Sequence, residues 1–462
     1  MRRNVVITGV GTVSALGIGI DALWDGVCQG RSGLVPIQRF DASGFDCRLA
    51  GEVAGFSAKD HVPKHYRKAV KVMCRDIELA IGAARCAVLD SGLTTRATIE
   101  DDGGEGTTEQ AATTYPGGRM GCHIGAGLIA ADADELAAAL VTSVATGDAA
   151  GSAGGTPPPT IDLARWGAGG MEAMTPLWLL KYLPNMLACH VTILHGCLGP
   201  SNTITCAEAS GLLSIGESRR IIERKSADLC FSGGAESKVN LMGLLRMGFA
   251  GRLAATGDAT SGADLVRPFD PASPGGLLGE GGGILILEAE ETARARGAKV
   301  YARIAGFGAA HAPPSPFTRD QLARGHRDVD EGLADAIIST LNDAALQPTD
   351  IDAAVVLGSG VPAIDHAEAG AIVSVFGPHA AKLELVPVGP NIGNCMAGTG
   401  ALLAAIAAKC VKEQTLPARL NAGSPDARLR AAAAPMRKAT LRNVLVATSA
   451  LGGQSAAMIV AA

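Results

Sequence analysis

Residues 199–216 read GPSNTITCAEASGLLSIG, and the prediction of the fold starts from this stretch. Asn202 to Thr205 is predicted as a short strand, a turn follows it, and the residues after Ser210 have the spacing of a helix. A strand that runs through a turn into a helix is a building unit of α/β proteins. The stretch therefore predicts a sheet with helices packed against it.

The same alternation of strands and helices occurs on both sides of this stretch. Near the N-terminus, residues 4–12 (NVVITGVGT) have the apolar run of a buried strand that enters a glycine turn. Further strands are predicted at residues 353–357, 444–449 and 457–460, and helices at residues 66–89, 321–346 and 398–411. We therefore predict an α/β protein with two similar lobes, although no sequence repeat relates them.

Two polar segments interrupt the alternation. Residues 101–118 are rich in glycine, threonine and acidic residues, and residues 146–170 contain GSAGGTPPPT. Such turn-prone segments are typical of surface insertions. A charged helix predicted at residues 288–296 comes before the second lobe. We therefore expect one lobe over residues 1–297 and the other over residues 298–462.

Composition narrows the class of protein. Of the 462 residues, 47% are hydrophobic and 18% are charged, which allows an extensive buried core and excludes global disorder. The formal net charge of -5 gives no electrostatic reason to expect a nucleic acid or an anionic membrane as partner. The apolar run after MRR is too short for a signal peptide, and no stretch is suited to span a bilayer. We therefore expect a cytoplasmic protein.

The cysteines and glycines indicate neither a metal nor a cofactor. The 11 cysteines are scattered without a C-x-x-C pair, which argues against a zinc site or a redox dithiol. We expect most of them to be buried as small hydrophobic side chains, as is usual for cysteines in the reducing cytosol. Gly279 and its neighbours lack the G-K-[ST] ending of a phosphate loop. We predict no cofactor and no metal ion.

Six motifs, in order along nearly the whole chain, resemble the β-ketoacyl-ACP synthase family. They are VVITGVGTVSALG (5–17), CLGPSNTITCAEASGLLSIGES (197–218), VRPFDPASPGGLLGEGGGILILEAEETARARGAKVYARIAGFG (266–308), PAIDHAEAGAIVSVFG (362–377), GPNIGNCMAGTGALLAAIAAK (389–409) and ALGGQSAAMIV (450–460). The resemblance implies the thiolase-like fold, in which two similar α/β lobes form five layers in the order α-β-α-β-α.

The residues that carry the chemistry of this family are replaced here. In the family, a cysteine on a sharp strand-to-helix turn takes up the acyl chain, and two histidines promote decarboxylation of malonyl-ACP. With gap-free spacing inside each motif, the cysteine position falls on Glu208, the first histidine on Leu357 and the second on Asn394. The supporting lysine falls on Gly389, and the gating phenylalanine falls on Ser449.

These replacements change what the site is expected to do. A carboxylate is a poor acyl carrier, Leu357 exchanges no proton, and Asn394 donates hydrogen bonds but does not titrate. Condensation by the route of the family is therefore expected to be absent. Glu208 itself has two readings, as a carboxylate that caps the start of a helix or as a general acid or base for a bound acyl group.

Two neighbouring residues offer alternatives to this alignment. Cys206 lies two residues before Glu208, and its use as the nucleophile would require the anchors on both sides to slip. A cysteine at a strand end is more often a packing residue. His366 is the imidazole nearest in sequence to Leu357, and we expect it on the surface of the following helix.

Three functions agree with this pattern. The favoured one is a non-condensing subunit, similar to the chain-length factors that pair with an active synthase. The second is an enzyme of altered chemistry, in which Glu208 acts on an acyl thioester. The third is a homodimer that binds acyl chains without reaction. The resemblance implies fatty acid or polyketide biosynthesis, an acyl carrier protein as partner, and a homodimer or a heterodimer with an intact ketosynthase, formed through a sheet edge beside the nucleophile strand.

Overall fold

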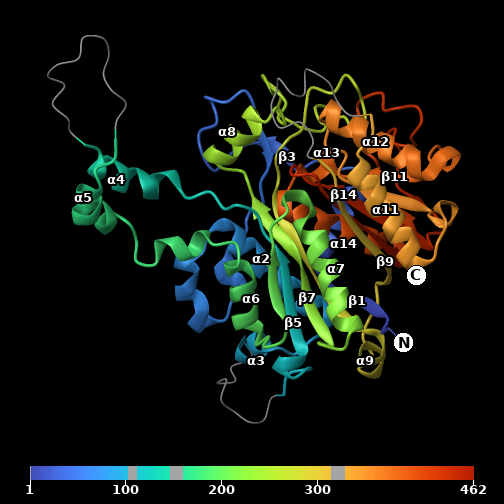
Figure 1. Cartoon of the computed structure of the whole chain (residues 1–462), viewed down its shortest axis with the longest axis horizontal. Coiled ribbons are helices and arrows are strands. Elements are labelled where there is room, and N and C mark those ends of the chain that lie inside the picture. The colour runs from blue at the N-terminus through green and yellow to red at the C-terminus, as the bar shows by residue number, and fades with distance from the viewer. Residues whose placement is uncertain (1, 102–111, 146–159, 314–327) are drawn as a thin grey trace.

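A single 11-stranded sheet runs through the computed structural model, which describes residues 2–101, 112–145, 160–313 and 328–462 (Figure 1). The order of its main path is β11-β10-β14-β15-β9-β1-β8-β7-β5-β6. These strands are β11 (Glu384–Pro387), β10 (Ala353–Val356), β14 (Asn443–Ser449), β15 (Gln454–Ala461), β9 (Ala302–His311), β1 (Val5–Ser14), β8 (Glu280–Ala289), β7 (Leu229–Ser237), β5 (Met120–Gly125) and β6 (Ser201–Ile204).

The sheet consists of two halves with the same topology. Read from its outer edge inward, each half has two parallel pairings followed by two antiparallel pairings: β6-β5-β7-β8-β1 in one and β11-β10-β14-β15-β9 in the other. The halves join where β1 pairs with β9 through Val6 and Ile7. The predicted α/β class is therefore confirmed. The division of the chain at residues 297 and 298, between α9 (Glu290–Ala295) and β9, stays a prediction.

Two helices fill the middle layer between the halves. Helix α7 (Ser210–Glu223) packs against β5 and β7, and helix α14 (Thr399–Glu413) packs against β14 and β8. The helices meet where both begin, because a Cβ atom added to Gly400 would lie 2.9 Å from the Cβ atom of Leu212. Small residues in α14 thus allow the two halves to share one apolar core.

Two further pairs of helices cover the outer faces. Helices α2 (Arg75–Ser91) and α6 (Met186–His195) lie on the N-terminal half of the sheet, with α2 against β1, β8 and β7. Helices α11 (Glu331–Ala344) and α12 (Pro362–Phe376) lie on the C-terminal half, with α11 against β9 and β15. The five layers expected from the resemblance are therefore present.

The helix predicted at residues 66–89 is wrong in its first part. The chain forms a 3-10 helix (Lys64–Val72), then an extended link, and only then α2. The link contains Met73, which is buried in the outer core of this half, whereas Val72 is exposed. Burial of Met73 thus overrides the local helical spacing.

Two other predicted helices begin later than expected. The helix predicted at residues 288–296 begins at Glu290, because Glu288 is a buried residue of β8 whose carboxylate accepts hydrogen bonds from Thr8 and Arg296. Of the helix predicted at residues 321–346, the first residues lie outside the described part. The described part begins α11 only after Asp330, whose side chain accepts from the Leu333 N–H at 3.0 Å.

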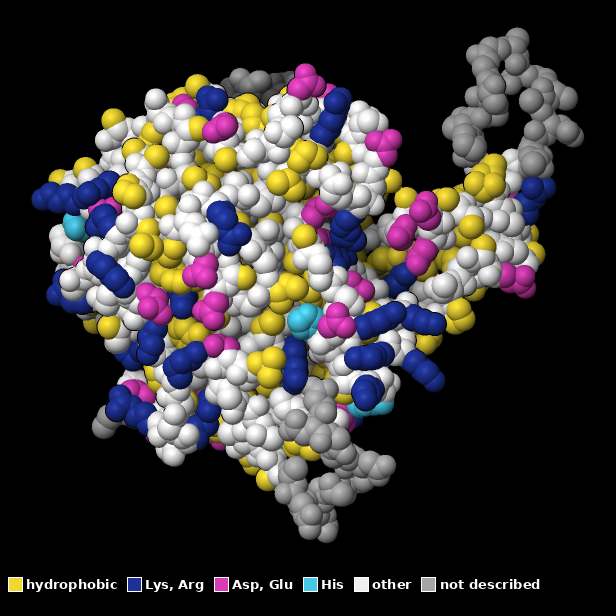
Figure 2. Space-filling view, turned by 180° about the vertical axis from the view of Figure 1, so that it is seen from behind, with side chains coloured by type: hydrophobic (Ala, Val, Ile, Leu, Met, Phe, Trp, Pro, Cys, Tyr) yellow, Lys and Arg dark blue, Asp and Glu magenta, His cyan; other side chains and the backbone are white. Residues whose placement is uncertain are grey.

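The two predicted insertions lie partly outside the described residues. The described parts of the first insertion are Asp101, the last residue of α3 (Arg96–Asp101), and residues 112–118. Those of the second are residues 160–170, which include α5 (Leu163–Arg165), while α4 (Ala133–Ser143) lies between the two insertions. Figure 1 shows α4 and α5 on an arm that projects from the body, formed by residues 130–145 and 160–183. Hydrophobic side chains are visible along this arm in Figure 2. The exposed ones include Val141, Leu163, Met171, Leu177 and Leu179.

None of the helices that the structure describes is long and apolar enough to cross a membrane.

Candidate functional site

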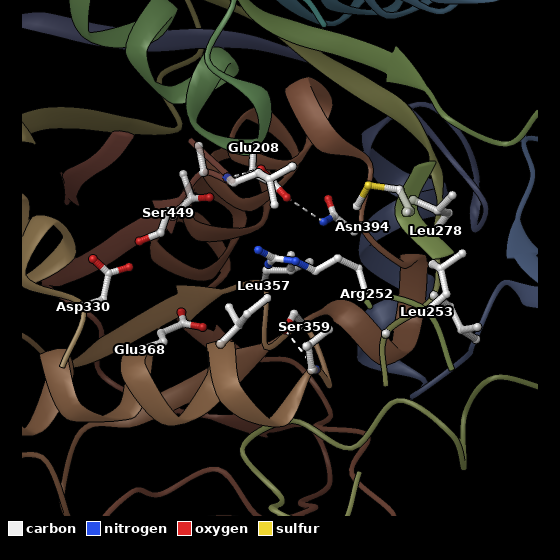
Figure 3. A pocket seen from close by; sticks show the side chains of 18 residues that line it. Glu208, Arg252, Leu253, Leu278, Asp330, Leu357, Ser359, Glu368, Asn394 and Ser449 are labelled. Carbon is white, nitrogen blue, oxygen red and sulfur yellow. Dashed lines mark hydrogen bonds between the residues drawn. The ribbon is translucent and has the colours of Figure 1, made fainter. Parts of the chain in front are cut away.

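A pocket lies where α7 and α14 begin and where β10 and β14 end (Figure 3). It encloses about 50 Å³, which is space on the scale of a few water molecules. Its lining brings together four of the five predicted site residues, namely Glu208, Leu357, Asn394 and Ser449. The fifth, Gly389, does not line it, but starts a short helix behind Leu357 and donates its N–H to the Leu357 carbonyl at 2.7 Å.

Glu208 stands on a tight turn between β6 and α7. Ala207 begins the turn with a φ of 43°, in a region that is costly for residues other than glycine. The Ser210 hydroxyl accepts from the Cys206 N–H at 2.7 Å and donates to the Ala207 carbonyl at 2.7 Å, which holds the turn. The turn directs Glu208 into the pocket, while Cys206 packs against the apolar middle layer. Burial raises the pKa of the Cys206 thiol.

Both carboxylate oxygens of Glu208 accept hydrogen bonds. Oε1 accepts from Nδ2 of Asn394 at 3.0 Å, and Oε2 accepts from the backbone N–H of Leu451 at 3.1 Å. The side chain is nearly enclosed, with 5% of the residue exposed. Glu208 therefore joins the start of α7 to the turn before α14 and to the turn after β14.

The amide of Asn394 has a fixed orientation. Its Oδ1 accepts from the Met396 N–H at 2.8 Å and from the Thr399 hydroxyl at 3.2 Å. Because the oxygen accepts hydrogen bonds from the residues that begin α14, the NH2 group must be the one that points toward Glu208. The Asn394 backbone is held as well, since its N–H donates to Leu277 and its carbonyl accepts from Gly279. Asn394 is thus a rigid donor.

Arg252 brings a positive charge into the pocket. It follows helix α8 (Leu241–Phe249), and only 7% of the residue is exposed. Figure 3 shows its side chain reaching to the middle of the pocket, toward Glu208 and Leu357. Burial lowers the pKa of Arg252, and the Glu208 carboxylate acts in the opposite direction. The Glu208 carboxylate therefore favours the charged form of the buried Arg252.

The opposite wall carries two further carboxyl groups, Asp330 and Glu368 (Figure 3). Burial raises the pKa of Glu368 well above its usual range, and the charges of Asp365 and Asp330 add to the rise. His366 does not line the pocket. It lies on the outer side of α12, with its Nε2 3.3 Å from Oδ1 of Asp328.

The lining of the pocket consists of apolar, polar and charged residues. Neither a cysteine nor a histidine occurs among the described residues that line it. Among all described residues, no three His, Cys, Asp or Glu side chains come together as ligands for a metal ion. The described lining can hold and orient a charged group, but it has no thiol or imidazole to react with an acyl chain.

Sequence reasoning missed two members of the site. Arg252 lies in the stretch FAGRLAATG, where a single arginine among apolar and small residues was its only signal. The Leu451 N–H is a backbone donor, and its direction depends on the turn after β14 rather than on any side chain. Arg252 could have been proposed as a site residue because it is a charged residue in an apolar stretch shortly before a family motif.

Comparisons with known proteins identify the family of the chain. The chain matches the beta-ketoacyl synthase N-terminal domain over residues 2–293 and the C-terminal domain over residues 301–423. It is 29% identical over 429 residues to 3-oxoacyl-[acyl-carrier-protein] synthase 2 of Staphylococcus aureus (strain COL), covering 92% of this chain and 89% of that protein.

Solved structures show the same relationship. The ishigamide ketosynthase/chain length factor matches with a TM-score of 0.79 and 28% identity, over 100% of this chain and 99% of the other. A type II polyketide-synthase acyl-carrier protein in complex with its ketosynthase matches with a TM-score of 0.78 over 100% of both chains, and its 20% identity shows the shared fold. The protein therefore belongs to the β-ketoacyl synthase family.

Proposed function

We propose that this chain is a non-condensing subunit of a fatty acid or polyketide synthase, which pairs with an intact ketosynthase. The observation that carries the proposal is the state of Glu208, whose two carboxylate oxygens are both held by fixed donors. A carboxylate in this position has neither the nucleophilicity of a thiolate nor the freedom to attack a thioester.

The other predicted site positions support the same conclusion. Leu357 lines the pocket with a side chain that exchanges no proton, and the Asn394 amide is committed to Glu208 and to the start of α14. Loss of one group would leave residual activity, but the combined changes remove both the acyl acceptor and the decarboxylation site.

The surface supports a protein partner. The short strand β6 forms one edge of the sheet and has β5 as its described strand partner. The projecting arm exposes large apolar side chains, and Leu198 just before β6 is 82% exposed. Such apolar surface is typical of a protein interface. An acyl carrier protein and an intact ketosynthase are the partners that the family relationship favours.

None of the 11 cysteines forms a disulfide, and free cysteines are typical of proteins in the reducing cytosol. This supports a cytoplasmic location of the proposed subunit.

Two alternatives are less well supported. An acid–base role for Glu208 would need an oxygen that substrate can reach, whereas each oxygen already accepts one hydrogen bond and only 5% of the residue is exposed. A stand-alone acyl-binding protein would need a larger pocket, because pockets for drug-sized ligands enclose about 300–1,000 Å³. A turnover assay with acyl thioesters, lost on Glu208→Gln, would favour the first alternative.

The test combines the full-length chain with an intact ketosynthase from the same genome and an acyl carrier protein. We expect co-purification of the two synthase chains, and condensation product only when both are present. Intact-mass spectrometry after incubation with acyl-ACP should show the acyl adduct on the partner alone. An adduct on Cys206, or condensation by this chain by itself, would refute the proposal.

The matched variant is Glu208→Cys. It restores a thiol to the turn but leaves Leu357 and Asn394 in place. We expect this variant to condense no acyl chains on its own, because the decarboxylation site is still missing. Recovery of condensation by this single change would mean that the rest of the site is intact after all.

A further inference from the structure

We propose that the pocket beside α7 is a carboxylate receptor that Glu208 occupies as a built-in ligand, and that this occupation keeps acyl chains out. The inference deepens the proposed function and rests on it, since a subunit that does not condense gains from a closed pocket. In this proposal, Arg252 is the residue that positions Glu208.

Two donors from separate segments, Nδ2 of Asn394 and the N–H of Leu451, hold the carboxylate. The guanidinium of Arg252 reaches into the same pocket and interacts with the Glu208 charge (Figure 3). Amide, backbone N–H and guanidinium groups are the donors that proteins use to bind carboxylates. Because Arg252 is buried beside Glu208, its charge is screened little by solvent and acts strongly on an anion held there.

The donors are held by contacts that do not involve Glu208. The oxygen of Asn394 is fixed by the start of α14. The turn that contains Leu451 is closed by hydrogen bonds from Ala450 to Gln454 and from Gly453 to Ala450, at 2.7 and 2.9 Å. The backbone of Arg252 donates to Met247 at 3.0 Å and accepts from Gly276 at 3.2 Å. We therefore expect these donors to keep their positions when the Glu208 side chain is removed.

Removal of that side chain has a defined consequence. It leaves buried donors without their acceptor, which is costly for the folded state. A small external carboxylate can then take the position and the hydrogen bonds of the lost group. Removal of the Glu208 side chain also enlarges the pocket, which encloses only about 50 Å³ when Glu208 is present.

Thermal unfolding of the full-length chain tests the receptor. We expect Glu208→Ala to lower the melting temperature by several degrees, and sodium acetate to restore it in a saturable way. Sodium chloride at equal ionic strength should not restore it, and neither salt should shift the wild type specifically. Binding to the folded state alone raises stability in this manner. The matched control is Glu217→Ala, which truncates a glutamate on the solvent side of the same helix and should gain nothing from acetate.

The contribution of Arg252 is tested by the variant Glu208→Ala combined with Arg252→Met. We expect the acetate response to fall at least tenfold in apparent affinity. Arg252→Lys in the same background should recover part of it, because the charge returns without the planar fork. An equal response to acetate and chloride in a folded Glu208→Ala variant would overturn the receptor.

A second measurement serves if Glu208→Ala does not fold. A fluorescent long-chain fatty acid is titrated into the wild type, Arg252→Met and Glu208→Gln. The wild type should show no saturable binding up to the highest concentration titrated, whereas Arg252→Met should bind saturably, with half-saturation at least tenfold below that concentration. Equal binding by wild type and variants would overturn the exclusion. Both measurements use this chain alone, so they report on the receptor even if pairing with a ketosynthase fails.

Discussion

Asn394 holds Glu208 and the start of α14 at the same time, so a change that keeps its shape but alters its charge is informative. In Asn394→Asp, a carboxylate oxygen replaces the NH2 group that lies 3.0 Å from Glu208. Two adjacent carboxylates raise the pKa of one of them, so the folded state binds a proton that the unfolded chain lacks. Stability should therefore fall as the pH rises.

We expect Asn394→Asp to cost about 1–3 kcal/mol near pH 8 and clearly less near pH 5. Urea unfolding at both pH values measures the difference. Asn342→Asp, on the exposed side of α11, is the control and should change stability little at either pH. Equal losses for Asn394→Asp at the two pH values would contradict the interaction with Glu208.

Asp76, at the start of α2, is a buried carboxyl group outside the pocket. One of its oxygens accepts from the Ser237 N–H at 3.1 Å, and the other has no hydrogen-bond partner in the described part of the chain. Burial, followed by the charge of Glu236, raises its pKa from 3.8 to about 7. Between these two values the folded state holds more protons than the unfolded chain, so this group makes stability fall as the pH rises.

Replacement of Asp76 by asparagine removes that penalty. We expect Asp76→Asn to raise the free energy of unfolding by on the order of 1–3 kcal/mol above pH 8, and by less near pH 5. Chemical unfolding across this range is the measurement, with Asp335→Asn on the exposed side of α11 as the control. A gain that does not depend on pH would show that Asp76 is ionised in the folded state throughout.

The sequence predicted part of the site, for reasons that apply to single residues. The gap-free spacing between Ser210 and the upstream motif put Glu208 on the turn, and the structure directs Glu208, not Cys206, into the pocket. The surroundings of Glu208 could not be predicted, because Leu451 donates through its backbone and the charge of Arg252 comes from a segment without a motif. Tertiary packing decides which of these groups come together, and the motifs of a single sequence do not predict such contacts.

At the scale of elements, the close contact of α7 and α14 makes a prediction. A Cβ atom at Gly211 would lie 2.7 Å from the carbonyl oxygen of Ala397, in the turn that leads into α14, and 3.2 Å from the nitrogen of Ala401 in α14. A Cβ atom at Gly248 in α8 would meet nothing within 4 Å. Both positions are helical, so alanine gains the same helix propensity at each, about 1 kcal/mol.

We therefore expect Gly248→Ala to stabilise the protein slightly and Gly211→Ala to destabilise it by about 1–3 kcal/mol. Thermal or urea unfolding of the two variants measures the difference, which isolates the cost of separating the helices. Similar effects at both positions would mean that the middle layer can expand without loss.

Elements with strong patterns were predicted well, and their boundaries less so. The alanine-rich helix and the last two strands follow from apolar runs that are buried on all sides. The break before α2 was missed because apolar spacing continues through Met73, and only the burial of that side chain reveals the extended link. Local periodicity predicts an element, but packing decides where it ends.

For the whole molecule, the edge strand β6 makes the partner interface testable. The carbonyls of Pro200 and Ile204 accept from β5, so alternate residues face β5 and the N–H of Thr203 points away from it. That N–H donates to the side chain of Asn202 at 2.8 Å. A proline at this position would remove an outward donor and leave the pairing with β5 intact.

We expect Thr203→Pro to reduce self-association or pairing with a ketosynthase at least tenfold, while the melting temperature of the separate chain changes little. Mass photometry or size-exclusion chromatography across a dilution series measures the loss. Thr203→Val keeps the N–H and is the control. Undiminished association of Thr203→Pro would place the interface elsewhere on the molecule.

The middle layer has a consequence for how the protein is made. Helix α7 leaves the ribosome long before α14 exists, because strands β7 to β11 are encoded between them, while β14 and β15 follow α14. At about 5–20 residues per second, the inner apolar face of the first half stays uncovered for many seconds. We therefore expect the nascent chain to be prone to aggregation during this interval, so that slow translation of the second half lowers the yield of native protein.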